Sequence, residues 1–194
     1  MTRRVGWVLG AMLFATKGMA IDMTYKGYET PSYAVTKQMD GFELRDYESH
    51  LVAEVTVEGS RDDVISAGFR ELAGYIFGGN EEDMKITMTS PVMQSPTGED
   101  WVVRFMMPTA YSIADLPKAN SDGVQFTQST SGRYAVAQFS GRATTVALNR
   151  ELAVLEERIA SAGLQMTGAP QFLFYDSPFT MPWNRRNEIA IPVQ

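Results

Sequence analysis

The sequence predicts an α+β fold in which two helices flank about eight antiparallel strands, and these strands can curl into a distorted barrel with both helices outside. Alternation of apolar and polar residues marks the strands, and two apolar stripes with helical spacing mark the helices. Both halves of the chain carry these elements in the same order. The sequence therefore predicts that the fold is built from a duplicated β-β-α-β-β half.

The first half begins with two alternating strands and continues with an amphipathic helix. A break at Gly59 precedes the helix, and Asp62 is its candidate N-cap. The helix is predicted to end near Ile76, because Gly78 and Gly79 follow. Its buried stripe is predicted to be Ile65, Phe69, Leu72 and Ile76. The predicted strands of this half are 42–47, 51–57, 85–94 and 101–107.

The second half repeats this order. Gly141 forms the break, and Thr144 or Thr145 can cap a helix that ends near Ala162. Its buried stripe is predicted to be Leu148, Leu152, Leu155 and Ile159. The tetrapeptide Arg-Glu-Leu-Ala occurs in both helices, at 70–73 and 150–153. The predicted strands of this half are 124–130, 133–140, 171–176 and 188–193.

The first twenty residues match the pattern of a secretory signal peptide. Arg3 and Arg4 give a positively charged start to an apolar run at 5–16, and a small-x-small pattern at Gly18 and Ala20 follows. The run is shorter than the ~20 residues that span a bilayer, which disfavours an uncleaved anchor. We expect an exported, periplasmic protein with a signal peptide (1–20), an extended lead-in (21–40) and a single domain (41–194).

Cleavage after Ala20 is expected to leave a mature chain that starts at Ile21 or within a few residues of it. Intact mass spectrometry of the exported protein checks this expectation, because the measured mass should lack residues 1–20. Full-length protein retained in the membrane fraction would contradict it.

Composition excludes several kinds of chemistry. The chain has no Cys and one His, so it carries no thiolate metal site, no Cys nucleophile and no metal site built from paired His. Its net charge of −6 disfavours binding to nucleic-acid phosphates. The sequence contains no GxGxxG after a strand and no GxxxxGK followed by Ser or Thr for nucleotides, no HExxH of metalloproteases and no GxSxG of hydrolases. We therefore expect neither catalytic residues nor a metal bound by protein side chains.

Methionine is the unusual component of this chain, with 12 residues. Five of them cluster in or beside the predicted central strands: Met84, Met88, Met93, Met106 and Met107. Because Met fills irregular space and adapts to variable apolar partners, the cluster indicates either core packing or a soft wall for a large, flat apolar ligand.

Six segments resemble the SOUL/haem-binding protein family and occur in the family's order. They are Phe42-Glu-Leu-Arg-Asp-Tyr47, Phe69-Arg-Glu-Leu-Ala-Gly-Tyr-Ile-Phe-Gly-Gly-Asn80, Lys85-Ile-Thr-Met-Thr-Ser-Pro-Val92, Arg104-Phe-Met-Met-Pro108, Phe139-Ser-Gly141 and Asn184-Arg-Arg-Asn-Glu188. The resemblance covers nearly all of residues 30–194. It implies a distorted eight-stranded barrel with two flanking helices and non-covalent binding of haem or a related tetrapyrrole, without turnover.

The resemblance also implies that the tetrapyrrole lies in a shallow apolar groove along the first helix. Small side chains there would let a ring system approach the backbone, and Arg70 could reach a propionate. Arg185 and Arg186 could do the same if the last turn folds over the groove, and otherwise they form a solvated turn. The candidate ligand-binding residues are Ser66, Phe69, Arg70, Ala73, Gly74, Phe77, Arg185 and Arg186.

An axial iron ligand is not expected from the resemblance. Some relatives carry a His between the Arg and the Tyr of the first strand, and Asp46 occupies that position here. His50 does not match it. In a polar turn, His50 is either an exposed turn residue or, alternatively, a haem ligand or a general base.

Hypotheses from different functional classes stay open for this chain: a tetrapyrrole-binding protein, an exported enzyme that acts on a small molecule, and a partner-binding module on the same fold. Haem has large apolar faces and two carboxylates, so its site needs an apolar groove rimmed by Arg or Lys. We expect a monomer whose partner is a small tetrapyrrole, with no nucleic acid bound and no membrane contact once the signal is removed.

Overall fold

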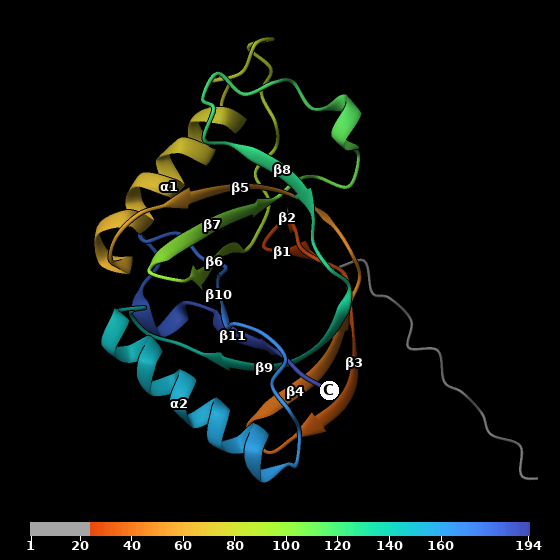
Figure 1. Ribbon diagram of the computed structural model, residues 1–194, viewed down its shortest axis with the longest axis vertical. Coiled ribbons are helices and arrows are strands. Elements are labelled where there is room, and N and C mark those ends of the chain that lie inside the picture. The colour runs from red at the N-terminus through yellow and green to blue at the C-terminus, as the bar shows by residue number, and fades with distance from the viewer. Residues whose placement is uncertain (1–23) are drawn as a thin grey trace, which may run out of the picture.

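The computed structural model describes residues 24–194, apart from the side chains of residues 63 and 64, so the predicted signal peptide lies outside the described residues. Both helices lie on the outer side of a large curved sheet (Figure 1). In chain order the elements are β1 (Thr24–Tyr25), β2 (Tyr28–Glu29), β3 (Tyr33–Met39), β4 (Phe42–Tyr47), β5 (Leu51–Val57), α1 (Arg61–Ile76), β6 (Val92–Thr97), β7 (Asp100–Met106), η1 (Ile113–Asp115), β8 (Gln125–Gln128), β9 (Gly132–Phe139), α2 (Thr145–Ser161), β10 (Gln171–Phe174), η2 (Pro182–Asn184) and β11 (Asn187–Pro192).

Nine of the described strands form one antiparallel sheet in the order β3-β4-β9-β11-β10-β6-β7-β5-β8, and β1 pairs with β2. In this sheet the strands of the first half, β4 to β7, correspond in turn to those of the second half, β8 to β11. When each strand is replaced by its counterpart, the order of these eight strands is the same order read from the other end. This symmetric order supports the predicted duplicated half. The ninth strand, β3, falls within the predicted lead-in and pairs with β4.

The β4/β9 and β5/β8 ladders keep the same register, although the residues between them, 48–50 and 129–131, belong to no strand. Tyr47 pairs with Gly132 between β4 and β9, and Leu51 pairs with Gln128 between β5 and β8. Four positions separate these two pairs along each stretch of chain, so the register is the same on both sides of the intervening residues. The large antiparallel sheet with two helices confirms the predicted α+β class, and closure of the strands into a barrel stays a prediction.

The strand predicted at 85–94 is longer than the observed one, because β6 begins only at Val92. The preceding segment makes its hydrogen bonds outside the large sheet or through side chains. The Ser90 N–H donates to the Glu29 carbonyl, and the Ser90 hydroxyl donates to the Tyr175 carbonyl. Pro91, which has no N–H, cannot extend a ladder from this side.

The helix boundaries follow from the breaks and caps of the sequence. Gly59 and Gly141 both have φ of +111°, a left-handed conformation that favours glycine, ahead of α1 and α2. Thr144 caps α2 as predicted, since its hydroxyl accepts a hydrogen bond from the Ala147 N–H at 3.2 Å. The predicted N-cap of α1 is wrong: Ser60 takes that position, and the Asp62 carboxylate instead accepts from the Thr145 hydroxyl.

Three apolar clusters form the core, one under each helix and a third on the sheet face turned away from the helices. α1 packs on β5 and β7, and α2 packs on β9 and β11. Alternate residues of a strand face opposite sides, so Val55 and Phe105 lie under α1 while Val52 and Met106 belong to the third cluster. This double burial explains the nearly continuous apolar runs of the strands.

The predicted helix stripes are confirmed in part. Leu72 and Ile76 are buried under α1, and Phe69 at the edge of the stripe is partly exposed. In α2, the side chains of Leu148, Leu155 and Ile159 are buried, whereas Leu152 is only partly buried. Neither helix of the described chain has the length and apolar character needed to cross a bilayer.

Candidate functional site

A groove of about 520 Å³ lies beside α1, between this helix and the segment that joins β10 to β11. Small-molecule sites typically occupy about 300–1,000 Å³. The Phe69 ring packs edge-on against Phe105, with ring centroids 5.4 Å apart, and its outer part lines the groove. The apolar wall of the groove consists of Ile65, Phe69, Val92, Ala143, Phe174 and Pro178.

Three guanidinium groups line the groove, but two of them are committed to the protein. Arg61 donates to the Gln94 side chain and the Ala143 carbonyl. Arg185 donates to the carbonyls of Thr180 and Pro178 and so holds the last loop together. Arg70 is exposed and makes no hydrogen bond or ion pair within the described residues, so it is the cation free to bind an anionic ligand.

A second hollow of about 320 Å³ adjoins the groove past Phe69 and Phe174. It adds the Met88 side chain to the apolar surface. Its carboxylate, Asp176, accepts hydrogen bonds from Lys26 and from the Arg186 N–H. Burial would raise the pKa of Asp176, but these hydrogen bonds outweigh that effect and lower it, so the acid stays charged and paired. The two hollows together form an apolar trough that a flat ligand can follow.

The structure brings together only some of the predicted ligand-binding residues. Ser66, Phe69, Arg70 and Arg185 line the groove. Ala73 is only 9% exposed and belongs to the core under α1, because it lies on the same side of the helix as Leu72 and Ile76. The other three lie outside the lining of the groove: Gly74, Phe77, which is 64% exposed, and Arg186.

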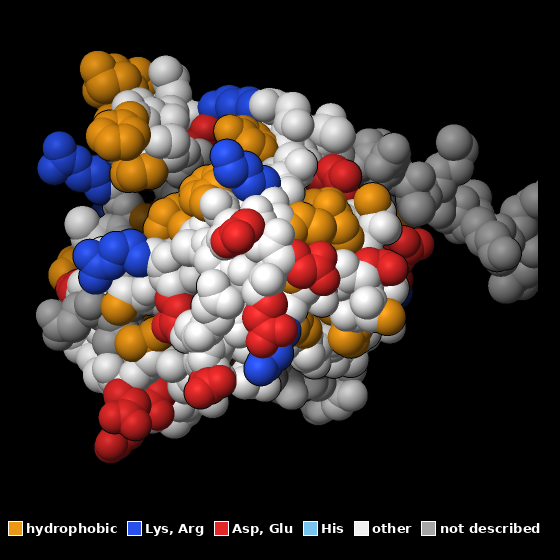
Figure 2. Space-filling view, turned by 90° about the horizontal axis from the view of Figure 1, so that it is seen from above, with side chains coloured by type: hydrophobic (Ala, Val, Ile, Leu, Met, Phe, Trp, Pro, Cys, Tyr) orange, Lys and Arg blue, Asp and Glu red, His pale blue; other side chains and the backbone are white. Residues whose placement is uncertain are grey.

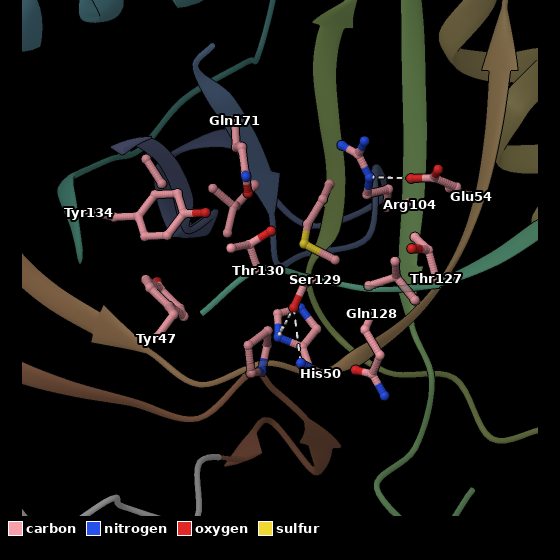
Figure 3. Close-up of a pocket in the computed structure, with 15 residues that line it drawn as sticks. Tyr47, His50, Glu54, Arg104, Thr127, Gln128, Ser129, Thr130, Tyr134 and Gln171 are labelled. Carbon is pink, nitrogen blue, oxygen red and sulfur yellow. Dashed lines mark hydrogen bonds and ion pairs between the residues drawn. The ribbon is translucent and has the colours of Figure 1, made fainter. Parts of the chain in front are cut away.

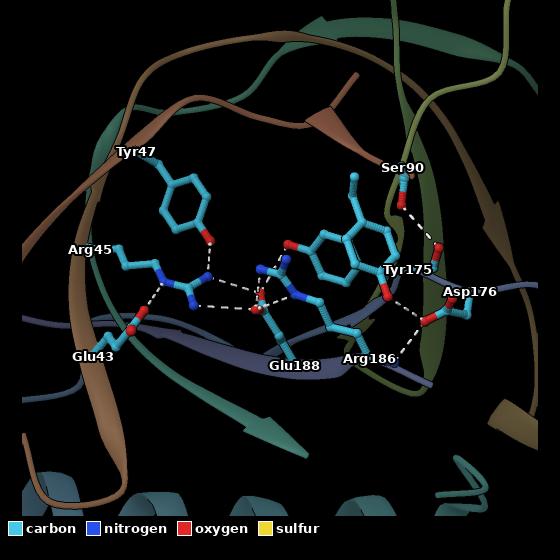
Figure 4. A network of polar contacts seen from close by, with 9 residues as sticks. Glu43, Arg45, Tyr47, Ser90, Tyr175, Asp176, Arg186 and Glu188 are labelled. Atoms are coloured by element: carbon cyan, nitrogen blue, oxygen red, sulfur yellow. Dashed lines mark hydrogen bonds and ion pairs between the residues drawn. The ribbon is translucent and has the colours of Figure 1, made fainter. Parts of the chain in front are cut away.

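Arg186 belongs to a buried polar network on β4 and β11 (Figure 4). At its centre is Glu188, with 0% exposure. Its carboxylate accepts bonds of 3.0 and 3.2 Å from Arg45, of 2.6 and 3.0 Å from Arg186, and of 2.9 Å from the Tyr175 hydroxyl. Burial and the charge of Glu188 raise the pKa of Tyr175, so its hydroxyl stays protonated and can donate.

Sequence reasoning missed this network, although Arg45, Arg186 and Glu188 fall in two of the family-like segments. Arg45 and Glu188 are 143 positions apart, and no local pattern indicates that they meet. The Arg-Arg-Asn-Glu segment resembles the family and therefore indicated a functional role. Its hydrogen bonds instead lie within the protein, from Arg186 to Glu188 and from Asn187 to the Gly141 carbonyl.

Asn80, the end of another family-like segment, also has a structural role. It is buried, its amide donates to the carbonyls of Tyr75 and Met84, and its side-chain oxygen accepts from the N–H groups of Glu82 and Met84. The side chain thus satisfies the backbone of the turn that follows α1, where only a short amide fits the pattern.

Neither Asp46 nor His50 lies in the groove. Asp46 pairs on the surface with Arg133, at 2.7 and 2.9 Å. His50 is partly buried rather than an exposed turn residue, and its Nδ1 lies 2.9 Å from the Ser129 hydroxyl. Burial lowers the pKa of His50, against a smaller opposing effect of its contact with the Glu48 carbonyl, which favours the neutral imidazole.

The outer surface carries mixed charge. Figure 2 shows cationic, acidic and apolar side chains interspersed on the face seen from above. This face offers no continuous basic surface of the kind that nucleic-acid phosphates require. The absence of nucleic-acid binding stays a prediction.

The fold and the groove define an α+β protein with an apolar groove between a helix and a curved antiparallel sheet. The chain belongs to the SOUL heme-binding protein family, which matches residues 28–192. Heme-binding protein 2 of Mus musculus is 25% identical over an alignment of 186 positions that covers 89% of this chain and 89% of that protein. Members of this family are generally non-catalytic.

Solved structures share the fold at low sequence identity. The C-terminal domain of EcmrR has a TM-score of 0.62 and 13% identity, covering 78% of this chain and 95% of that chain. A hydrolase from Listeria innocua has a TM-score of 0.57 and 10% identity, covering 82% of this chain and 94% of that chain. At these identities the likeness concerns the fold alone.

Proposed function

We propose that this protein binds haem or a related tetrapyrrole non-covalently, without turnover, in the groove beside α1. The observation that carries the proposal is the free cation Arg70 at the rim of an apolar groove, in a chain of a haem-binding family. The proposal includes export to the periplasm after loss of residues 1–20 and action as a monomer.

The groove fits the chemistry of a tetrapyrrole. Phe69 and Phe174 offer aromatic surface to a flat ring system, and Ser66 keeps the face of α1 open. Arg70 would bind a propionate, and a hydrogen bond between two charged groups is worth about 1.5–3 kcal/mol. When bound, haem supplies an iron centre. The lining of the groove contains no imidazole, thiolate or thioether, so its own side chains hold the ring and the carboxylates.

Hemin is expected to bind with micromolar affinity and a small Soret shift, and Arg70→Ala should weaken binding about 10-fold or more. Absorbance titration with hemin measures both effects. Arg150→Ala is the matched control, because Arg150 is exposed on α2 and lines neither hollow of the trough. Equal hemin affinity of the Arg70 and Arg150 variants would remove the proposed contact with the propionate.

A bulky side chain at Ser66 tests the place of binding. The sequence predicts that Ala73 faces the groove, which would make Ala73→Trp the obvious blocking variant. Ala73 is buried in the core, however, so this variant would disturb the fold instead. Ser66 is exposed and lines the groove, so Ser66→Trp should block hemin while leaving the core intact. His50→Ala should leave the Soret band nearly unchanged. Loss of the Soret shift in His50→Ala, with normal binding in Ser66→Trp, would contradict the groove.

A further inference from the structure

A separate cavity of about 350 Å³ lies on the face of the sheet that is turned away from both helices (Figure 3). It shares no lining residue with the groove beside α1 or with the adjoining hollow. Strands of both halves of the chain contribute to it, and its volume falls in the usual range for a small-molecule site. The inference drawn from it is therefore independent of tetrapyrrole binding.

The walls of this cavity suit an aromatic molecule. Tyr47 and Tyr134 form an edge-to-face pair with centroids 5.4 Å apart and an angle of 85° between their planes. Both rings line the cavity, and aromatic rings pack favourably on one another, so a third aromatic group can pack against them. Met93, with an adaptable thioether side chain, and Leu173 complete the apolar side.

The cavity presents no uncompensated charge. Glu54 and Arg104 are the acidic and basic residues of its lining, and they pair with each other at 2.6 Å. Arg104 also donates to the Ser95 hydroxyl. His50, at the lower wall in Figure 3, is held in the neutral form by burial, which lowers its pKa. A charged ligand would lose its hydration without gaining an opposite charge, which disfavours it.

Several polar groups that line the cavity have unused hydrogen-bonding capacity. The side chains of Tyr134, Gln171 and Thr130 make no hydrogen bond within residues 24–194, although all three line the cavity. Figure 3 shows the Tyr134 hydroxyl directed toward the interior, with Gln171 at the upper wall. In addition, the buried His50 Nε2 has no partner in the described part of the chain. A ligand with its own hydroxyl group can satisfy such groups.

We propose that this cavity binds a small, uncharged aromatic molecule that carries a hydroxyl group. Its ring packs against Tyr47, Tyr134 and Leu173. Its hydroxyl forms a hydrogen bond with the Tyr134 hydroxyl, in which either group can donate. The exposed Thr127 on the edge strand β8 lies at the mouth of the site.

2-Naphthol is a suitable probe, and its fluorescence reports binding to the whole mature chain, from Ile21 to Gln194. Tyr134→Phe should weaken 2-naphthol binding about 5-fold and leave naphthalene, which has no hydrogen-bonding group, unchanged. Tyr111→Phe is the matched control, because Tyr111 lines neither this cavity nor the trough. Thr127→Tyr should abolish binding of both probes, since Tyr is well accepted on an exposed edge strand but fills the mouth.

Two further measurements test the preference of the cavity for an uncharged ligand and its independence from the groove. N-methylquinolinium, a cation of similar size, should bind at least about 10-fold more weakly than 2-naphthol, and saturating hemin should not displace 2-naphthol. Tighter binding of the cation, competition by hemin, or full 2-naphthol binding in Thr127→Tyr would each overturn the proposal. Failure of hemin to bind at all would affect only the proposed tetrapyrrole function.

Discussion

Replacing Glu188 by Ala is expected to lower the free energy of unfolding by about 3–5 kcal/mol. Glu188 is completely buried, and its carboxylate is shared by the guanidinium groups of Arg45 and Arg186 (Figure 4). Arg45 is itself only 4% exposed. Although burial acts to lower the pKa of Arg45, the charge of Glu188 raises it overall, so the guanidinium stays charged. Removal of the carboxylate therefore leaves a buried cation without its main partner.

Urea denaturation measures this loss, and Glu54→Ala is the matched control. Glu54 pairs with Arg104 on β5 and β7, but both side chains are about a quarter exposed, at 25% and 27%. Fully exposed pairs are worth about 0–1 kcal/mol, and a pair that reaches solvent should cost less to break than a completely buried one, so Glu54→Ala should cost less than Glu188→Ala. The double variant Glu188→Ala with Arg45→Met should recover part of the loss, because it removes the unpaired charge as well. A cost below about 1 kcal/mol for Glu188→Ala would contradict the role of the network.

Leu72→Ala is expected to lower the free energy of unfolding by about 2–5 kcal/mol. Leu72 has no exposed surface and packs under α1 against the residues of β5 and β7. Leu155 has the same burial under α2, and Leu155→Ala should cost a similar amount. In both positions the removed atoms leave a cavity that the surrounding strands cannot close.

Leu152 provides the comparison, since the sequence repeat pairs it with Leu72. It is only partly buried, so Leu152→Ala should cost less than about 2 kcal/mol in the same denaturant experiment. Equal losses at Leu72 and Leu152 would mean that the two helices contact the sheet with equivalent residues. Near-zero losses at both Leu72 and Leu155 would contradict the observed helix faces.

Most of the elements could be predicted because they depend on neighbouring residues. The alternation of 42–47 and 51–57 predicts β4 and β5 within their observed bounds. Thr144 and the two break glycines likewise act through the backbone next to them. The end of the segment 85–91 could not be predicted in this way, because the hydrogen bonds of Ser90 go to Glu29 and Tyr175, which are distant in the sequence.

The lining of the candidate groove could be predicted mainly for the residues that helical spacing places on one face of α1. Ser66, Phe69 and Arg70 follow from helical spacing combined with the family resemblance, and all three line the groove. Ala73 was misplaced because a small apolar residue fits either side of an amphipathic stripe, and only the position of the sheet decides which side is covered. For Arg186, its place in the network depends on Glu188 and Tyr175 rather than on the sequence of its own turn.

By itself, the sequence determined the α+β class, the repeat, the family and the identity of the helix that borders the groove. These features rest on periodicity and on motifs, which are properties of contiguous residues. Only the tertiary structure decided that Arg45 meets Glu188 across 143 positions, and that Tyr134 and Gln171 line one cavity. Such contacts depend on the order in which strands pair, and that order is set by packing of the whole chain rather than by any local pattern.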